Sequence, residues 1–559
     1  MLYIYTNIID KEKYILLENF MRDVEQFNWN DCKDDDLNQY LIKFTEKLNY
    51  FYCHHFPFKI KYVTKKEFSR PWITSRVKKL LEIKSDYFRL YRMGLVSSQD
   101  NNRVKNKVKS LVNKAKNNYY RNYFEQNRKN MKATWSMINT LTSRNCSFSS
   151  IKSILYNDQV FVDDFEISNV FNKYFCDIGR ELDENLPPSN VDPISFVRFN
   201  NASSLFLSPV LPSECLFIIC NLKKSKQNVN SIPVNLFIEC RNSLVNCICN
   251  LINTSFSTGI FPDSLKLAQT IPLFKKGDRQ NISNYRPISI LPFMSKIFEK
   301  CIHHRIMDFF ISNSILSKEQ YGFIKGRSTE DAMIQLSNFI YDSLNNKQNC
   351  INIFIDFRKA FDTINHNILL RKLMKYGIRG VPLRLMSSYL QGRSQVVRIN
   401  KSVSTQCDIK IGIPQGSILG PLLFLIYIND LPNLSDSYKT ILFADDTTLC
   451  FRGTDLPRVV SSCNLELVKF REWSISNRLS INIEKTNYTI ISNLHLDNAT
   501  LPTISLNIQP LCRKTTVTFL GVVLDDGMKF SHHIKYVCKK ISKSIGIFYQ
   551  LRHCLSKSI

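Results

Sequence analysis

The stretch Ile441-Leu442-Phe443-Ala444-Asp445-Asp446-Thr447-Thr448-Leu449-Cys450-Phe451 decides the fold expected for this chain. It places two adjacent aspartates between two short runs of apolar and β-branched residues, and such runs are typical of buried strands. Strand, tight acidic turn and strand together predict a β-hairpin with both carboxylates at its tip. A single apolar run before Asp-Asp would more often end in an ordinary turn, so the second run favours a functional site.

A second acidic site follows the same pattern. The run Ile351–Ile355 leads directly into Asp356, and in Phe357–Asp362 the period changes so that a helix can begin. Carboxylates at the ends of core strands cost free energy unless a cation lies between them. Divalent metal ions, with their preference for oxygen ligands, are the usual cation, and two such ions can clamp the oxygens of a phosphoryl transfer. The two sites therefore predict a nucleotidyl-transfer enzyme.

Length and charge fit a large enzyme with a polyanionic partner. The chain has 559 residues, enough for three or more domains, and a formal net charge of +27. Charge alone leaves nucleic acid and anionic membrane open. No apolar run reaches transmembrane length, charges occur too early for a secretory signal, and the 17 cysteines form no paired CxxC units. We therefore expect reduced thiols, no membrane association, and a nuclear or cytoplasmic location.

The first 150 residues are expected to be helical and basic. Between positions 101 and 130, apolar residues recur at helical spacing. The remaining positions are crowded with basic residues: Arg103, Lys105, Lys107, Lys109, Lys114, Lys116, Arg121, Arg128 and Lys129. Solvated helix faces usually mix both signs of charge. The one-signed charge, interleaved with Tyr119, Tyr120, Tyr123 and Phe124, favours contact with RNA or DNA through phosphates and base stacking.

Further motifs lie on both sides of the first acidic site. A proline-containing, loop-rich stretch at 186–212 precedes a mixed α/β region that reaches about residue 525. Within it, Ile271–Asp278 and Asn284–Ser289 supply lysines and an arginine suited to a triphosphate. The run Gly412–Leu422 places glycines where a backbone must approach something closely and then opens a helix, which is weak evidence alone.

The ordered set of motifs resembles the reverse transcriptase domain of non-LTR (LINE-type) retrotransposons of the jockey-like and related animal clades. Besides the runs quoted above, it includes Gln320–Phe323, Lys325–Thr329 and, downstream, Phe519–Val522. Single residues between them also match the family: Trp473, Asn477, Leu479, Asn482, Lys485 and Thr486. The resemblance covers roughly residues 200–540, and its specificity comes from seven or more motifs in the right order.

The resemblance implies a role for the acidic residues and the aromatic residue that follows them. Asp356 and Asp445 match the metal-bridging carboxylates, with Asp446 beside them, and two Mg²⁺ ions are the implied cofactors. Phe361 matches the aromatic gate that occupies the space of a ribose 2′-OH, so that deoxynucleotides are selected.

Other positions match substrate contacts of the family. Gln415 and Gly416 correspond to the turn that packs on the incoming nucleotide and the template base. Arg286 and one of Lys275 and Lys276 correspond to residues that bind the triphosphate.

The last set of matches lies downstream. Lys485 matches the lysine proposed as the acid for the pyrophosphate leaving group, although an exposed lysine beside a strand is ordinary. Phe519, Leu520 and Gly521 match the hairpin that grips the primer terminus.

The implied architecture is an α+β right-hand polymerase with fingers, palm and a partial thumb. We expect a basic, mostly helical extension and linker at 1–200, fingers and palm at 201–525, and the start of a thumb at 526–559. The family often has an endonuclease domain before the polymerase. The first 150 residues, including Arg70–Thr74, instead resemble the linker after that domain, so a fragment of an element is expected.

The expected reaction is RNA-templated addition of deoxynucleotides to the 3′-OH of a DNA primer. The expected partners are therefore an RNA template, a DNA primer and dNTPs. Two alternatives remain: a catalytically silent RNA-binding remnant of a mobile element, and a group II intron-type maturase. The intron-type maturase region is not found after the expected thumb, which disfavours the second alternative.

Overall fold

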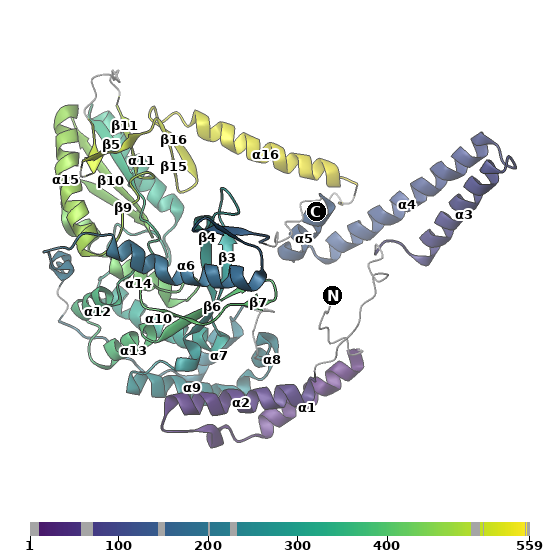
Figure 1. Cartoon of the computed structure of the whole chain (residues 1–559), viewed down its shortest axis with the longest axis horizontal. Coiled ribbons are helices and arrows are strands. Elements are labelled where there is room, and N and C mark those ends of the chain that lie inside the picture. Colours follow the sequence, from purple (N-terminus) through teal and green to yellow (C-terminus); the bar gives the residue numbers. More distant parts are fainter. Residues whose placement is uncertain are drawn as a thin grey trace. The chain divides into compact units, whose positions relative to one another are not determined.

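The computed structural model describes residues 10–57, 71–142, 151–199, 202–223, 232–492, 503–506, 508–553 and 555 (Figure 1). The chain divides into two compact units, and each is considered by itself. The larger unit comprises residues 8–57 and 151–532, and the smaller comprises 1–7, 58–150 and 533–559. Of the helices in the described ranges, none is both long enough and apolar enough to cross a membrane. Arg70 and residues 556–559 lie outside the described residues.

The larger unit mixes helices with two main sheets, as predicted. Its helices are α1 (Asp10–Gln26), α2 (Leu37–His55), α6 (Asp164–Glu184), α7 (Pro212–Cys220), α8 (Val234–Glu239), α9 (Arg241–Thr258), α10 (Phe293–Ser312), α11 (Thr329–Asn345), α12 (His366–Lys375), α13 (Val381–Leu390), α14 (Leu419–Tyr427) and α15 (Leu456–Ser476). Short 3₁₀ helices are η1 (Trp29–Cys32), η3 (Pro193–Phe196), η4 (Asp263–Leu265), η5 (Ile282–Asn284) and η6 (Leu431–Leu434).

The strands of this unit follow the chain from β1 to β16. They are β1 (Ile154–Tyr156), β2 (Gln159–Phe161), β3 (Leu267–Phe274), β4 (Tyr285–Ile290), β5 (Asn349–Ile355), β6 (Arg393–Ile399), β7 (Ser402–Val403), β8 (Cys407–Ile409), β9 (Lys439–Phe443), β10 (Asp446–Gly453), β11 (Asn487–Ile491), β12 (Ser505–Leu506), β13 (Gln509–Pro510), β14 (Cys512–Arg513), β15 (Thr516–Phe519) and β16 (Val522–Asp525).

The central sheet, with strand order β14-β11-β5-β10-β9, contains both predicted acidic strand ends. The predicted hairpin is confirmed as β9 and β10, which pair antiparallel. β5 pairs antiparallel with β10, and Thr447 lies opposite Ile355. Asp446 directly precedes Thr447, and Asp356 directly follows Ile355. The register therefore brings the two acidic sites to the same end of two neighbouring strands.

Alternate residues of β5 face two different cores, as the two-residue period of a strand requires. On one face Ile351 and Ile353 join the main core, which includes apolar residues of α14 and α15. On the other face Cys350 packs in a smaller core with α11 and the β15–β16 hairpin. Both faces of β5 are thus covered, which explains why this strand has apolar residues on both faces.

A second sheet of five strands, with β8 beside β6, has the order β4-β3-β6-β7 along its main path. β3 pairs antiparallel with β4, and Leu273 lies opposite Arg286. This pairing places the predicted phosphate-binding segments on neighbouring strands.

The helix expected directly after Asp356 begins later, so that prediction was wrong. Residues 358–363 form turns in which Lys359 has a φ of +49°, and α12 starts only at His366. The cause is twofold. The Asn365 side chain accepts hydrogen bonds from the first N–H groups of α12 and so caps it there. The N–H groups of Gly412 and Ile413 bind carbonyls of the turn, which holds it out of a helix.

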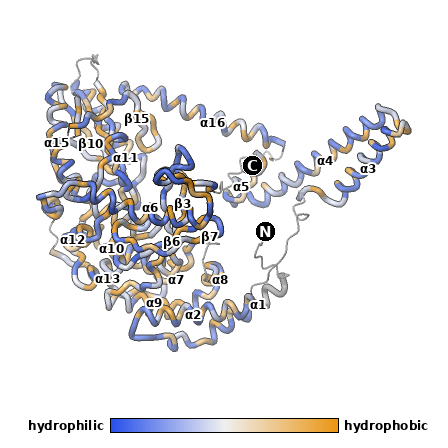
Figure 2. Tube along the Cα trace, viewed as in Figure 1, coloured by the Kyte–Doolittle hydropathy of each residue, from blue (hydrophilic) through white to orange (hydrophobic). Residues whose placement is uncertain are grey.

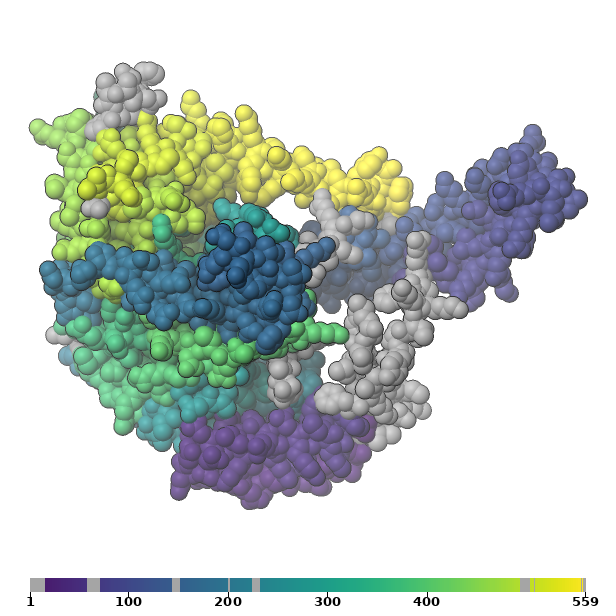
Figure 3. Space-filling model, in the orientation of Figure 1, coloured from purple at the N-terminus to yellow at the C-terminus, as the bar shows by residue number. Residues whose placement is uncertain are grey.

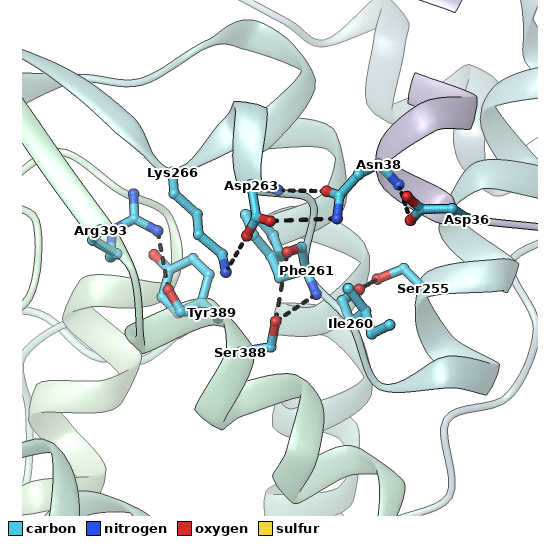
Figure 4. A network of polar contacts seen from close by, with 10 residues as sticks. All are labelled: Asp36, Asn38, Ser255, Ile260, Phe261, Asp263, Lys266, Ser388, Tyr389 and Arg393. Atoms are coloured by element: carbon cyan, nitrogen blue, oxygen red, sulfur yellow. Dashed lines mark hydrogen bonds and ion pairs between the residues drawn. The ribbon is translucent and has the colours of Figure 1, made fainter. Parts of the chain in front are cut away.

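The larger unit includes segments that the sequence assigned to an N-terminal extension. α2 is joined to η4, because Asp263 N donates to Asn38 Oδ1 at 2.8 Å and Asn38 Nδ2 donates to Asp263 Oδ2 at 3.3 Å (Figure 4). Asp263 also accepts a hydrogen bond from Lys266. α6 runs across one face of this unit (Figure 3). The two units divide the chain at residues 7/8, 57/58, 150/151 and 532/533.

The smaller unit is helical, with α3 (Ser75–Arg92), α4 (Ser98–Gln126), α5 (Met131–Leu141) and most of α16 (Ser531–Leu551). Hydrophilic segments recur along α4 (Figure 2), whose basic residues are largely exposed. The core of the smaller unit contains Tyr120 and Phe124, packed with Ile138 and Leu551. The expectation that these two aromatic residues stack on bases is therefore wrong. Tyr119 and Tyr123 are half-buried.

A fully buried ion pair joins three helical segments of the larger unit. Lys372 Nζ of α12 lies 2.8 Å from Asp430 Oδ1, and neither residue is exposed. Lys372 also donates to the carbonyl of Tyr427 in α14, and the indole N–H of Trp473 in α15 donates to Asp430.

Replacing Lys372 by Met is expected to lower the free energy of unfolding by about 3–5 kcal/mol, because it leaves the Asp430 carboxylate buried without its cation. Chemical denaturation measures this change. Arg371→Met is the matched control, since Arg371 forms an exposed pair with Asp192 and should cost under about 1 kcal/mol. Equal losses in the two variants would contradict a special role for the buried pair.

Candidate active site

Asp445 lies in the β9–β10 turn, and Asp446 begins β10. Ala444 adopts a φ of +53° there, and the Gln320 side chain stabilises the turn. Gln320 Oε1 accepts hydrogen bonds from Gly322 N at 2.8 Å and from Ala444 N at 3.0 Å. A Cβ on Gly322 would lie 2.4 Å from Ala444 N, so only glycine fits. The run Gln320–Phe323 therefore supports the acidic turn.

Asp356 is held by the segment between α15 and β11. Its carbonyl accepts a hydrogen bond from Asn482 N at 2.7 Å, and its N–H donates to Thr486 Oγ1 at 3.3 Å. Lys485 belongs to the same segment, and its Nζ lies 3.8 Å from Asp356 Oδ2. The structure thus places Lys485 beside a carboxylate of the site.

Burial and neighbouring carboxylates raise the pKa of Asp445 and of Asp446. Burial, followed by the charges of Asp445 and Asp356, raises the pKa of Asp446 to about 6. Burial is also the main cause of the raised pKa of Asp445, to which Asp356 adds. Lys275 and Arg286 oppose both shifts. Three negative groups therefore repel one another where two cationic side chains approach.

The predicted phosphate-binding residues lie on the second sheet at this site. Lys275 follows β3, and its N–H donates to the carbonyl of Asn284 at 2.9 Å. Burial lowers the pKa of Lys275, and the charges of Arg286 and Lys485 lower it further. Lys276 adds a smaller effect of the same sign. Cations this close to one another indicate a place for an anionic ligand.

The segment that contains the predicted gate, Phe361, is in contact with the glycine-rich turn at 412–416. The Phe361 ring stacks on Phe424 of α14, with ring centroids 4.6 Å apart and planes inclined by 20°. Gln415 Nε2 donates to Asp362 Oδ1 at 2.8 Å. Gly416 has a φ of +133°, and a Cβ there would lie 2.3 Å from the carbonyl oxygen of Ser289. The turn thus needs glycine because it approaches β4.

The predicted primer-grip residues form the tip of the β15–β16 hairpin. Leu520 and Gly521 have φ angles of +46° and +93°, as in the two-residue turns that suit the twist of a hairpin. The Phe519 ring lies 5.9 Å from that of Phe354 in β5, which anchors the hairpin on the central sheet.

No group of three or more His, Cys, Asp or Glu side chains is arranged to hold a metal ion within the described part of the chain. The donor chemistry nevertheless fits a divalent cation. Asp356, Asp445 and Asp446 offer carboxylate oxygens as ligands, and burial together with the charges of Asp445 and Asp356 raises the pKa of Asp446. A divalent cation would neutralise these charges.

Sequence reasoning missed three supporting side chains. Gln320 and Asp362 lie inside motifs that were recognised, but no role was given to either. Glu299 of α10 lies in none of the motifs. Its buried carboxylate accepts hydrogen bonds from Ile418 N at 2.5 Å and Leu419 N at 3.3 Å, at the start of α14. An acid within an apolar helix was the one available signal.

Comparison with known proteins agrees with this geometry. Residues 274–524 match the family model described as reverse transcriptase (RNA-dependent DNA polymerase). This segment is a reverse transcriptase domain. It contains every predicted site residue, from Lys275 to Gly521, and all strands of the central sheet. The second sheet lies within it except for β3, of which only Phe274 is included.

Relatives of the reverse transcriptase domain come from mobile elements. The chain is 28% identical over 358 residues to the probable RNA-directed DNA polymerase from transposon X-element of Drosophila melanogaster, covering 63% of this chain and 39% of that protein. It is 27% identical over 372 residues to the RNA-directed DNA polymerase from mobile element jockey of the same organism, covering 64% and 40%. The chain thus matches well under half the length of these relatives, whose names agree with the resemblance that the sequence motifs indicated.

Proposed function

We propose that this chain is an RNA-directed DNA polymerase that adds deoxynucleotides to the 3′-OH of a DNA primer. The observation that carries the proposal is the convergence of Asp356, Asp445 and Asp446 with Lys275 and Arg286 inside the reverse transcriptase domain. Names of the relatives, which describe RNA-directed DNA polymerases, support it.

The right-hand arrangement is part of the proposal. The central sheet would be the palm, the second sheet would belong to the fingers, and α16 would begin the thumb. On this assignment residues 201–525 provide fingers and palm, residues 526–559 provide the start of the thumb, and the segments before them form the extension.

The three aspartates would hold two Mg²⁺ ions. When bound, such ions activate the primer hydroxyl and neutralise the triphosphate. Lys275, Lys276 and Arg286 would bind and orient the phosphates, because their positive charges converge beside the carboxylates. Lys485 would donate a proton from its Nζ to the pyrophosphate leaving group.

Primer extension tests this function directly. Purified full-length chain, given RNA annealed to a DNA primer, dNTPs and Mg²⁺, is expected to lengthen the primer. Failure to extend a primer–template that the protein binds would contradict the polymerase assignment and favour an RNA-binding remnant.

The basic helix α4 supports a second part of the proposal, which is RNA binding by the smaller unit. A shallow depression of about 560 Å³ on α4 is lined only by polar and basic side chains: Asn106, Lys109, Ser110, Asn113, Lys114, Asn117, Asn118 and Arg121. Lys109, Lys114 and Arg121 are exposed, and no acid lines the depression. Such a surface suits a phosphate backbone.

Replacing Lys109, Lys114 and Arg121 together by Gln is expected to weaken RNA binding and to flatten its salt dependence. Each lost phosphate contact to a single strand reduces the slope of log affinity against log salt by about 0.7, so three contacts give a change of about 2. Filter binding at several salt concentrations measures it. Lys78, Lys79 and Lys84 of α3, changed to Gln, form the charge-matched control. If the control flattens the slope equally, diffuse charge binds the RNA and the depression has no special role.

A further inference from the structure

Given the polymerase function proposed above, we propose that Asp362 is a positioning residue that orients the side-chain amide of Gln415 for the incoming nucleotide and template base. Gln415 Nε2 donates to Asp362 Oδ1 at 2.8 Å. An ionised carboxylate only accepts hydrogen bonds, so it selects the amide orientation in which Nε2 faces Asp362 and Oε1 points elsewhere. The carboxylate thus determines which polar atom Gln415 can present to a ligand.

The backbone of Asp362 is fixed from two sides. A Cβ on Gly179 of α6 would lie 2.2 Å from the carbonyl oxygen of Asp362, and a Cβ on Gly412 would lie 2.7 Å from the same atom. The Asp362 N–H donates to the carbonyl of Lys359 at 2.8 Å. Asp362 therefore cannot shift unless α6 or the glycine-rich turn moves with it.

The backbone of Gln415 is also fixed. Its carbonyl accepts a hydrogen bond from Ser289 N of β4 at 2.8 Å, and the neighbouring Gly416 touches the Ser289 carbonyl. β4 also carries Arg286. With both backbones held, the hydrogen bond to Asp362 is the contact that sets the side-chain torsions of Gln415.

The charge state of Asp362 adds a second property. Its Oδ2 is buried and has no hydrogen-bond partner among the residues that the structure describes. Burial raises the pKa of Asp362 to about 6, against the hydrogen bond from Gln415 and the charges of Lys359 and Arg286. Tyr174 faces it from α6, and burial and then Asp362 raise the pKa of that phenol to about 12. Above its pKa the carboxylate accepts from Nε2, whereas the protonated acid can donate to Oε1 and favour the opposite amide orientation.

A double-mutant cycle tests whether Asp362 and Gln415 affect nucleotide binding through their shared contact. Asp362→Ala and Gln415→Met are each expected to raise KM for the correct dNTP about tenfold, the effect of losing a hydrogen bond to a charged group, with kcat within about threefold. The double variant should be no worse than the worse single variant, because both changes remove one contact. Asp408→Ala, which alters an exposed carboxylate of β8, is the matched control. If the effects of the two single substitutions on KM multiply in the double variant, the proposal is overturned.

A pH profile of the dNTP KM tests the role of Asp362 even if Asp362→Ala fails to fold. Asp362→Asn keeps an acceptor oxygen but cannot titrate. The dNTP KM of wild type should rise more steeply as pH falls through about 6 than that of Asp362→Asn, in which Asp446 still titrates but position 362 does not. Identical profiles would overturn the proposal. Wild-type extension separates the two levels: a wild type that does not extend primers refutes the polymerase function, whereas extension with identical profiles refutes only the role of Asp362.

Discussion

Replacing Asp445 by Asn is expected to lower the polymerisation rate by about 10³-fold or more, while RNA binding stays near wild type. Metal ions supply several kcal/mol of transition-state stabilisation, and each 1.36 kcal/mol corresponds to about a factor of ten in rate. Asparagine keeps the shape of the side chain but loses the charge that would hold the ion. Asp356→Asn and Asp446→Asn should behave in the same way. Single-turnover primer extension measures the rate.

Asp436→Asn is the matched control, because it makes the same chemical change at an exposed position outside the site. It should retain wild-type activity. If instead the aspartate variants of the site lose RNA affinity or unfold, the carboxylates have a structural role and the polymerase mechanism proposed for them is wrong.

The stability of the metal-free protein is an independent measure of how unfavourable the charge of Asp446 is in the folded state. The pKa of Asp446 is raised to about 6 in the folded chain, well above the value of about 3.9 for an unperturbed aspartate. The folded state therefore binds the proton more tightly, and the free energy of unfolding should rise as pH falls from above 6 to below about 4. Asp446→Asn removes the part of this dependence that Asp446 contributes, whereas Asp362 and Asp445 keep theirs. At pH 7 without divalent ions, it should be at least as stable as wild type, as expected of a site whose charges serve function.

The parts of the fold that could be predicted are those that depend on short, contiguous segments of sequence. The strands before Asp356 and Asp445 are apolar because both faces of the central sheet are covered, and such runs are visible without a structure. The hairpin at Leu520 and Gly521 was expected from the resemblance of Phe519–Gly521 to a family motif, and the structure forms a turn there.

The unpredicted part depends on contacts between distant segments. Nothing near Asp362 in the sequence indicates that Gln415 will bind it, because that contact depends on backbone pairing between the turn after Asp356 and the glycine-rich loop. The delayed start of α12 has the same origin. The bonds between Asn38 of α2 and Asp263 were also hidden, since an amphipathic helix does not reveal which surface it will cover.

Replacing Phe361 by Val should relax sugar selection, with the preference for dNTPs over rNTPs falling by about 10²-fold. Steric discrimination of a small group in a closed pocket is worth about 10–200-fold. The structure holds Phe361 in place, because its ring stacks on Phe424 and its backbone carbonyl accepts a hydrogen bond from Ile413 N at 2.9 Å. Competitive incorporation of matched dNTP and rNTP pairs measures the ratio.

Phe424→Leu separates the gate from simple packing. It removes the partner on which the Phe361 ring stacks but leaves the ring itself, so the sugar preference should fall only in part. Both variants remove aromatic surface from the same core, and their losses in unfolding free energy should be similar, about 1–3 kcal/mol. A core role for Phe361 predicts the stability loss with an unchanged sugar preference. A gate predicts that Phe361→Val admits ribonucleotides far more readily than Phe424→Leu does, at equal stability.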